Sequence, residues 1–338
     1  MKSPSAGPQR YEALDGLRGV AALAVCFFHI RWANHITEWN GIRHAFVFVD
    51  LFFMLSGFVL FNAYGAYITN RSRVVEFLTL RFFRIYPLHF AILMGLVLLE
   101  ATKLLGELRG VVVPEHAAFS GQNSPGLLVV NLLLLQGFPF AGQLSWNTPS
   151  WSISCEAAGY VVFAAACFIG LVKRFAVGFW IAVAILSYVI VLAVKQSLDA
   201  SYDLGLLRCL GGFCVGIAIA KFIRIESVAS WFNACGERTM TLITGGIVLW
   251  IVVALSYVDG YSEAVLLPAF AALILVLHRD SGAVAGALKS APLAFLGRVS
   301  YSVYMIHVPV LMVALSVLTR RLRTGQDSAL KVNYPWLG

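Results

Sequence analysis

Charged side chains are scarce in this sequence. Asp, Glu, Lys and Arg together make up 12% of the 338 residues, whereas hydrophobic residues make up 59%. Length alone would favour two soluble domains, but a chain so rich in apolar runs of near membrane-span length is typical of a bilayer protein. The runs are continuously apolar rather than alternating, which excludes barrel strands and leaves helices as the spanning element. The sequence therefore predicts an all-α, polytopic transmembrane helical bundle.

Acidic residues are the scarcer kind of charge, at 17 against 25 Lys and Arg, which gives a formal net charge of +8. The basic residues lie mostly in short links between apolar runs, where they orient helices by the positive-inside rule. We therefore expect membrane lipids as partners of this protein, and no nucleic acid.

Several other features are missing. The six cysteines show neither metal-ligand spacing nor a disulfide framework, so the sequence predicts no metal site. Residues 1–10 are polar and the first apolar run contains charges, which a cleaved signal peptide lacks. No repeat, low-complexity block or soluble domain is apparent. We expect residues 1–338 to form a single integral-membrane domain.

The apolar runs predict about nine spans. They cover residues 14–32, 46–60, 85–105, 151–172, 175–194, 204–220, 240–258, 263–277 and 293–318. A basic loop with four arginines precedes the third span, and Pro87 suits the first turn of that span.

One further apolar segment, residues 127–138, is too short for a crossing. It has only about a dozen residues and holds Asn131 and Gln136, which is typical of a re-entrant or buried segment. If it re-enters, the basic links after residues 172, 220 and 278 all fall on the cytoplasmic side. If it spans, giving ten crossings, they fall outside, against the positive-inside rule. We therefore expect re-entrance and a cytoplasmic N-terminus.

The first span contains ionisable residues, which hydrocarbon should exclude and which are functional by default. Arg18 and His29 are eleven positions apart, about three turns or 16 Å, so both project from one face of a helix. Asp15 precedes Arg18 by one turn and can pair with it. His29 can act as base or nucleophile, and Arg18 offers a fixed charge for phosphate or carboxylate. Alternatively, Arg18 snorkels to the interface and His29 only hydrogen-bonds inside the bundle.

A second polar group opens the span at 151–172. Ser152, Glu156 and Tyr160 recur every four residues, so they form one helical stripe that should face the bundle interior. Glu156 can orient a protonated histidine or bind a sugar hydroxyl. Hydrogen bonding between helices is the alternative use of such a stripe.

Further ionisable residues lie in or beside other spans. Arg81 and Arg84 are either ordinary cytoplasmic cations or, beside the entrance of a donor substrate, a polyphosphate site. Asp50 lies inside the second span near its outer end, and His307 lies inside the last span. Ionisable residues are costly inside hydrocarbon, so both are candidates for a functional role.

These segments together resemble the membrane-bound acyltransferase 3 family. The matching patterns are residues 14–19 (LDGLRG) with His29, 49–58 (VDLFFMLSGF), 81–87 (RFFRIYP), 151–156 (WSISCE) and 296–304 (LGRVSYSVY) with His307. The likeness runs from residue 11 to about residue 310, and the ordered set is far more specific than any single motif.

The resemblance implies transfer of an acyl group, usually acetyl from acetyl-CoA, to hydroxyls of an extracytoplasmic carbohydrate or glycolipid. It makes His29 and Arg18 the essential residues, and we expect Glu156 to join them in catalysis. Donor binding would fall to Arg18, Arg81 and Arg84. Acceptor contacts would fall to Asp50, Ser152, Tyr160 and His307. Because a CoA thioester is already activated, we expect no permanently bound cofactor and no metal.

The sequence also departs from the family pattern. Ala157 and Ala158 follow Glu156, where the family often has an acid and a Gln. One long helix fewer follows the His307 segment, which would place residues 320–323, with three arginines, outside. No esterase-like domain follows either.

The resemblance implies a bacterial cytoplasmic (inner) membrane location. Two rival functions stay open: an acyltransferase for a small hydroxylated metabolite such as a macrolide, and a proton-coupled transporter or flippase. The second rival also buries ionisable residues, but such folds often pair broken helices in two halves, and only one short segment occurs here.

Overall fold

A computed structural model of the protein describes residues 10–30, 35–110 and 116–322, with the backbone alone over 315–322. Within these ranges the chain forms helices and turns, and no strand. Eight of the helices are long and apolar enough to cross a membrane. They are α3 (Phe48–Tyr64), α4 (Arg71–Leu108), α6 (Trp151–Phe168), α8 (Val177–Lys195), α9 (Gly205–Phe222), α11 (Glu237–Tyr257), α12 (Leu266–Leu277) and α14 (Ala291–Leu322).

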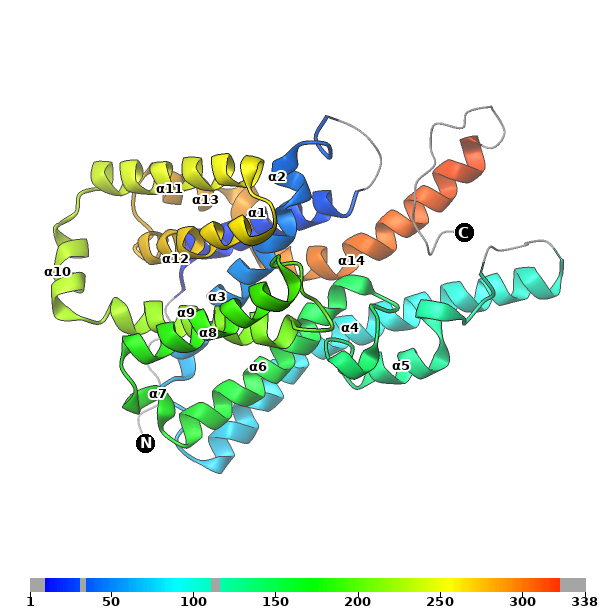
Figure 1. Ribbon diagram of the computed structural model, residues 1–338, viewed down its shortest axis with the longest axis horizontal. Coiled ribbons are helices and arrows are strands. Elements are labelled where there is room, and N and C mark those ends of the chain that lie inside the picture. Colours follow the sequence, from blue (N-terminus) through cyan, green and yellow to red (C-terminus); the bar gives the residue numbers. More distant parts are fainter. Residues whose placement is uncertain (1–9, 31–34, 111–115, 323–338) are drawn as a thin grey trace.

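Short 3-10 turns lengthen three of these spans at their N-terminal ends. They are η1 (Ala45–Val47) before α3, η4 (Thr148–Ser150) before α6 and η5 (Gly260–Val265) before α12. Helix α1 (Glu12–Phe28) has 17 residues and packs along α14 as a further apolar helix of the bundle. The predicted all-α, polytopic bundle is therefore confirmed (Figure 1).

The remaining elements are short and lie toward the ends of the bundle. They are α2 (Asn40–Arg43), η2 (Gly121–Asn123), α5 (Pro125–Leu132), η3 (Pro139–Ala141), α7 (Leu171–Arg174), α10 (Glu226–Ala234) and α13 (Ala283–Leu288). Figure 1 shows α2 and α5 toward one end, and α7 and α10 toward the other. The arginines at 320, 321 and 323 fall outside the residues whose side chains are described.

The segment at 127–138 does not form a crossing helix. Helix α5 has eight residues, about 12 Å of rise, against a hydrocarbon core of about 30 Å. Backbone carbonyls at its end accept hydrogen bonds from α4: His89 Nε2 reaches Asn131 at 2.9 Å, and the Tyr86 hydroxyl reaches Leu132 at 3.1 Å. The chain then turns back, and Gln136 donates to the carbonyl of Ser150 at 2.9 Å. The links after α6, α9 and α12 consequently lie at one end of the bundle.

Helix α4 corrects the prediction of a basic loop followed by a span from residue 85. It begins at Arg71, where the side chain of Asn70 accepts a hydrogen bond from the Arg73 amide at 3.0 Å and caps the first turn. Pro87 therefore lies well inside the helix and not in its first turn. Arg and Leu are good helix formers, so the helix can start at the Asn70 cap and continue through Pro87, although a proline usually marks the first turn of a helix. The arginines at 81 and 84 are thereby fixed on a rigid helix.

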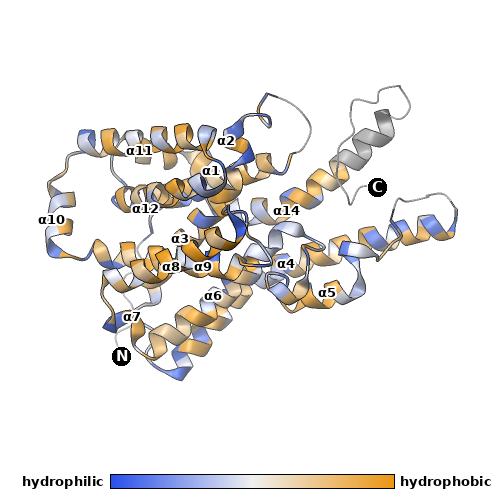
Figure 2. Cartoon of the chain, in the orientation of Figure 1, coloured by the Kyte–Doolittle hydropathy of each residue, from blue (hydrophilic) through white to orange (hydrophobic). Residues whose placement is uncertain are grey.

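Apolar side chains cover the outer surface of the long helices. Leu98, Leu186 and Leu249 are each exposed over more than half of their surface. Figure 2 shows hydrophobic colour along most of the long helices and hydrophilic colour at many helix ends and links. This pattern is the reverse of a soluble protein's and fits a lipid-facing surface.

Glycines allow three pairs of helices to pack at backbone contact. A Cβ at Gly16 would collide with the carbonyl of Leu288, and one at Gly297 with the carbonyl of Asp15, so α1 touches α13 and the start of α14. Between α3 and α9, Gly57 and Gly216 meet the partner backbone in the same way. Small residues at helix contacts are the usual packing device in membranes.

Candidate active site

A cavity of about 320 Å³ lies inside the bundle, among α1, α3, α4, α6 and α14. Six of the predicted site residues line it. They are Arg18, Arg81, Arg84, Ser152, Glu156 and Tyr160. These residues come from three of the motifs noted in the sequence, so the fold brings separate motifs to one space.

One side of the cavity is strongly basic. Arg18 lies 3.3 Å from Asp15, which confirms the pair predicted across one turn of α1, and Asp15 also binds Arg10 at 3.0 Å. Arg81 donates to the hydroxyl of Tyr64 at 3.1 Å. Arg84 lines the cavity without an acidic partner among the described residues. Three guanidinium groups and two carboxylates, of Asp15 and Glu156, thus give this cavity a net positive charge.

The polar stripe of α6 faces the cavity, as predicted. Glu156 accepts a 2.6 Å hydrogen bond from the hydroxyl of Ser56 on α3. The hydroxyls of Ser152 and Tyr304 lie 2.8 Å apart, and both donate to the carbonyl of Pro149. Hydrogen bonding between helices and a cavity-facing position therefore coexist in the same residues.

The two histidines lie side by side just beyond Tyr304. Their rings are 4.8 Å apart, with His307 Nε2 at 3.2 Å from His29 Nδ1. Neither histidine lines the cavity; Tyr304 does, and its ring lies 5.8 Å from that of His307. The chain separates Arg18 from His29 by about 16 Å of helix rise, so the basic side and the histidine pair lie at different depths.

Hydrogen bonds to backbone carbonyls determine which ring nitrogens carry the hydrogens. His307 Nδ1 lies 2.6 Å from the carbonyl of Tyr304, and His29 Nδ1 lies 2.9 Å from the carbonyl of Val25. A carbonyl only accepts, so both Nδ1 atoms must donate. His307 Nε2 is then an acceptor for His29 Nδ1–H. In neutral His29 the lone pair consequently resides on Nε2, the atom suited to act as base or nucleophile.

Asp50 takes no part in the cavity lining. It is fully buried and bound by Arg208, whose Nη2 lies 2.6 Å from one carboxylate oxygen and whose Nε lies 3.0 and 3.1 Å from both. The hydroxyl of Tyr188 donates a further bond at 3.1 Å. Every oxygen of Asp50 is thus engaged by its neighbours. This arrangement points to a structural role rather than the predicted contact with an acceptor.

Arg208 is the residue that the sequence reading missed. It is 1% exposed in the middle of the bundle, and it joins α9 to α3 through Asp50 and to the carbonyls of Phe46 and Ala200. The sequence could have indicated it, because an Arg within the apolar run at 204–220 is costly in a membrane and needs a partner.

Comparison with protein families decides the class of the protein. The model of the acyltransferase 3 family, described as an acyltransferase domain, matches residues 11–337. The chain belongs to this family. It is therefore an acyltransferase of the membrane-bound kind. Several residues of the motifs noted in the sequence line the cavity, and His29 and His307 form the histidine pair beyond it.

Three known proteins are similar in sequence to this acyltransferase. Acyltransferase MdmB of Streptomyces mycarofaciens is 29% identical over 89% of this chain and 79% of its own length. The putative membrane-bound transacylase BcsY of Komagataeibacter xylinus is 26% identical over 90% of this chain and 74% of its own. Protein 2 in the picA locus of Rhizobium radiobacter is 34% identical over 46% of this chain and 82% of its own. No solved structure matches.

Proposed function

We propose that this acyltransferase moves an acyl group, most simply acetyl, from acyl-CoA to a hydroxyl of an extracytoplasmic carbohydrate. The observation that supports this most directly is the arrangement of the site: a cavity with three arginines, followed by a histidine pair farther along α1. In the part of the chain that the structure describes, α5 is a single short segment, without the paired broken helices that are typical of a transporter.

The donor would enter at the basic side of the cavity. The planar guanidinium groups of Arg18, Arg81 and Arg84 suit the phosphates of CoA, because each can offer two parallel donors to a phosphate. The pantetheine arm would then extend toward the outer half of α1. Helices α1 and α14 would guide it, since they pack along one another from Gly16 to His29.

His29 would perform the transfer. Its Nε2 takes the proton from the acceptor hydroxyl, the hydroxyl oxygen attacks the thioester carbonyl carbon, and the carbon–sulfur bond breaks to release CoA thiolate, which recovers the proton. Alternatively, Nε2 attacks the thioester carbonyl carbon and the carbon–sulfur bond breaks to release CoA thiolate. The hydroxyl oxygen then takes the acyl group from Nε2, and the hydroxyl proton goes to the thiolate. In both routes a positive charge develops on His29, and its Nδ1–H stays bonded to the Val25 carbonyl and to His307. His307 is then a positioning residue.

The acceptor is identified by comparing cells with and without the gene. Mass spectrometry of envelope glycans should show a mass loss of one acetyl group per modified sugar when the gene is deleted, and restoration by the wild-type gene but not by the His29→Ala variant. If the glycans are unchanged and an exported small metabolite loses the acyl group instead, the acceptor is that metabolite. If neither changes, the proposal fails.

A further inference from the structure

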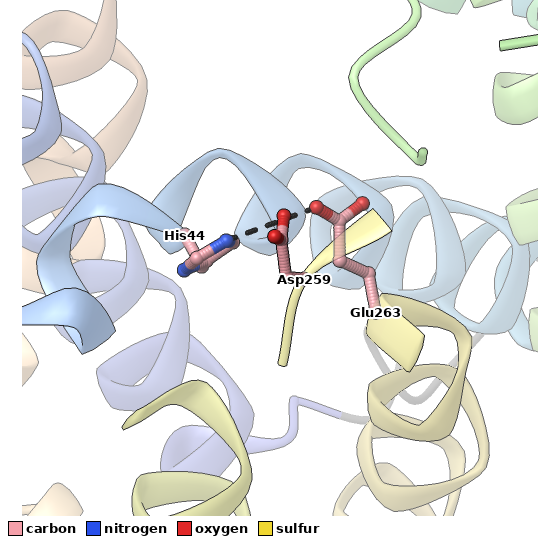
Figure 3. A group of neighbouring side chains, drawn as sticks. All are labelled: His44, Asp259 and Glu263. Atoms are coloured by element: carbon pink, nitrogen blue, oxygen red, sulfur yellow. Dashed lines mark ion pairs between the residues drawn. The ribbon is translucent and has the colours of Figure 1, made fainter. Parts of the chain in front are cut away.

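Three side chains converge at the end of the bundle that carries α2, outside the cavity. His44 follows α2, while Asp259 and Glu263 belong to the link between α11 and α12. One nitrogen of the histidine and one oxygen of each acid all lie within 4.8 Å of one another (Figure 3). More than 200 residues of sequence separate the histidine from the acids, so the fold alone brings them together.

Hydrogen bonds hold each of the three side chains in place. His44 Nδ1 lies 3.0 Å from the carbonyl of Asn40, to which it must donate. Oε2 of Glu263 accepts from the Ser197 hydroxyl at 2.7 Å and from the Leu198 amide at 2.6 Å. Asp259 caps the turn η5 that follows it. Such outer hydrogen bonds orient metal ligands in known sites.

The charges of this cluster are not balanced by the surrounding residues. The Glu263 side chain is 3% exposed, and its Oε1 is aimed at His44 Nε2, which lies 3.9 Å away, too far for a hydrogen bond. No Lys or Arg pairs with either acid in the described part of the chain. Because Nδ1 of His44 donates, a neutral ring presents a lone pair at Nε2. Three acceptors then face one another, and a buried carboxylate without a cation is expensive.

We propose that His44, Asp259 and Glu263 bind a divalent transition-metal ion, Zn²⁺ by preference. One imidazole nitrogen with two carboxylate oxygens is a donor set that suits Zn²⁺, whereas Ca²⁺ and Mg²⁺ favour oxygen alone. Water completes the coordination from the exposed side, where Asp259 lies. The ion neutralises the two acids and replaces the 3.9 Å gap with two metal–ligand bonds.

The bound ion acts as a cross-link between loops. It joins the segment before α3 to the link between α11 and α12, and, through Ser197 and Leu198, to the link between α8 and α9. The ring of His44 also lies 6.1 Å from that of Phe46, whose carbonyl binds Arg208. The ion therefore stabilises the end of the bundle and takes no part in the acyl transfer.

The test uses purified, chelator-stripped protein in detergent, titrated with Zn²⁺ while metal content and melting temperature are measured. We expect one equivalent of Zn²⁺ per chain and a rise in melting temperature. His44→Ala and Glu263→Gln should each weaken Zn²⁺ binding about tenfold or more and abolish the rise. His116→Ala, which removes an exposed histidine elsewhere, is the matched control and should behave as wild type.

Two results would overturn the proposal. Equal Zn²⁺ binding by wild type and Glu263→Gln would place the metal at another site. A wild-type melting temperature that is insensitive to Zn²⁺, but that falls in Glu263→Gln, would show an ion pair with protonated His44 instead of a metal.

Discussion

At the scale of single residues, the two histidines and Arg18 are the side chains on which the proposed acyl transfer depends. The motifs predicted that both His29 and His307 matter, but not that they touch, because the sequence places them 278 positions apart on different helices. The same holds for Asp50. Its position inside a span was predictable from hydropathy, whereas its pairing with Arg208 depends on how α3 packs against α9. Spacing within a helix can be calculated, while contacts between helices depend on packing.

The role of His307 can be separated from that of an acceptor contact. His307→Ala removes one of the two acceptors for His29 Nδ1–H and leaves only the Val25 carbonyl, so we expect kcat to fall about tenfold or more while donor affinity stays unchanged. His307→Gln retains a side-chain acceptor and should recover part of the loss. Steady-state kinetics with both substrates varied checks this. A rise in acceptor KM with kcat unchanged would instead make His307 a substrate contact.

Arg18 distinguishes phosphate binding from snorkelling. Lys snorkels as well as Arg does, but it lacks the planar fork that binds a phosphate through two hydrogen bonds. Losing one charged hydrogen bond costs about 1.5–3 kcal/mol, so Arg18→Lys should weaken acyl-CoA binding about tenfold or more in a detergent titration. Arg298→Lys, at an exposed position on α14, is the control. Unchanged affinity in Arg18→Lys would make that residue an interface anchor.

At the scale of helices, hydropathy predicted which elements cross but not where each begins. Helix α4 extends back through the basic stretch to its cap at Asn70, because charged residues on a helix beyond the bilayer are as stable as in a loop. Helices α10 and α13 were not predicted, since each is short and lies in a link whose composition is mixed. Cap residues and packing, rather than apolar content, set these boundaries.

Contact between α3 and α9 should be intolerant of a single methyl group. A Cβ at Gly216 would overlap the backbone of Met54, Gly57 and Phe58, so Gly216→Ala should reduce stability by about 1–3 kcal/mol. Gly245→Ala in α11 is the matched control, because nothing lies within 4 Å of its new Cβ and Ala favours a helix over Gly. Thermal unfolding in detergent measures both. Equal melting temperatures would show that the helices are not packed at backbone contact.

At the scale of the whole molecule, the proposed direction of acyl transfer requires the N-terminus and the links after α6, α9 and α12 to lie in the cytoplasm. The lengths of the apolar helices indicate which of them cross the membrane. Because α5 is too short to cross, it determines on which side of the membrane each later helix begins. Positive charge then selects one of the two orientations. Sequence was sufficient for the all-α, membrane-spanning architecture, because lipid imposes a single rule on every span, unlike the contacts within the site. The orientation stays a prediction.

Orientation is checked with single cysteines and an impermeant thiol reagent on intact cells. Ser201→Cys, between α8 and α9, should be labelled above the background of the parent protein. Ser227→Cys, at the start of α10, should be labelled only after the membrane is opened. The opposite pattern would mean that the segment at 127–138 crosses the bilayer.

The central claim is that His29 carries out acyl transfer across this bundle, and one assay tests it directly. Inverted membrane vesicles supplied with radiolabelled acetyl-CoA should transfer label to luminal carbohydrate when they contain the wild-type protein. His29→Ala should insert normally, because one neutral side chain barely changes hydropathy, yet transfer should fall about a hundredfold or more. His116→Ala should match wild type. Transfer at the wild-type rate by a correctly inserted His29→Ala protein would contradict the account.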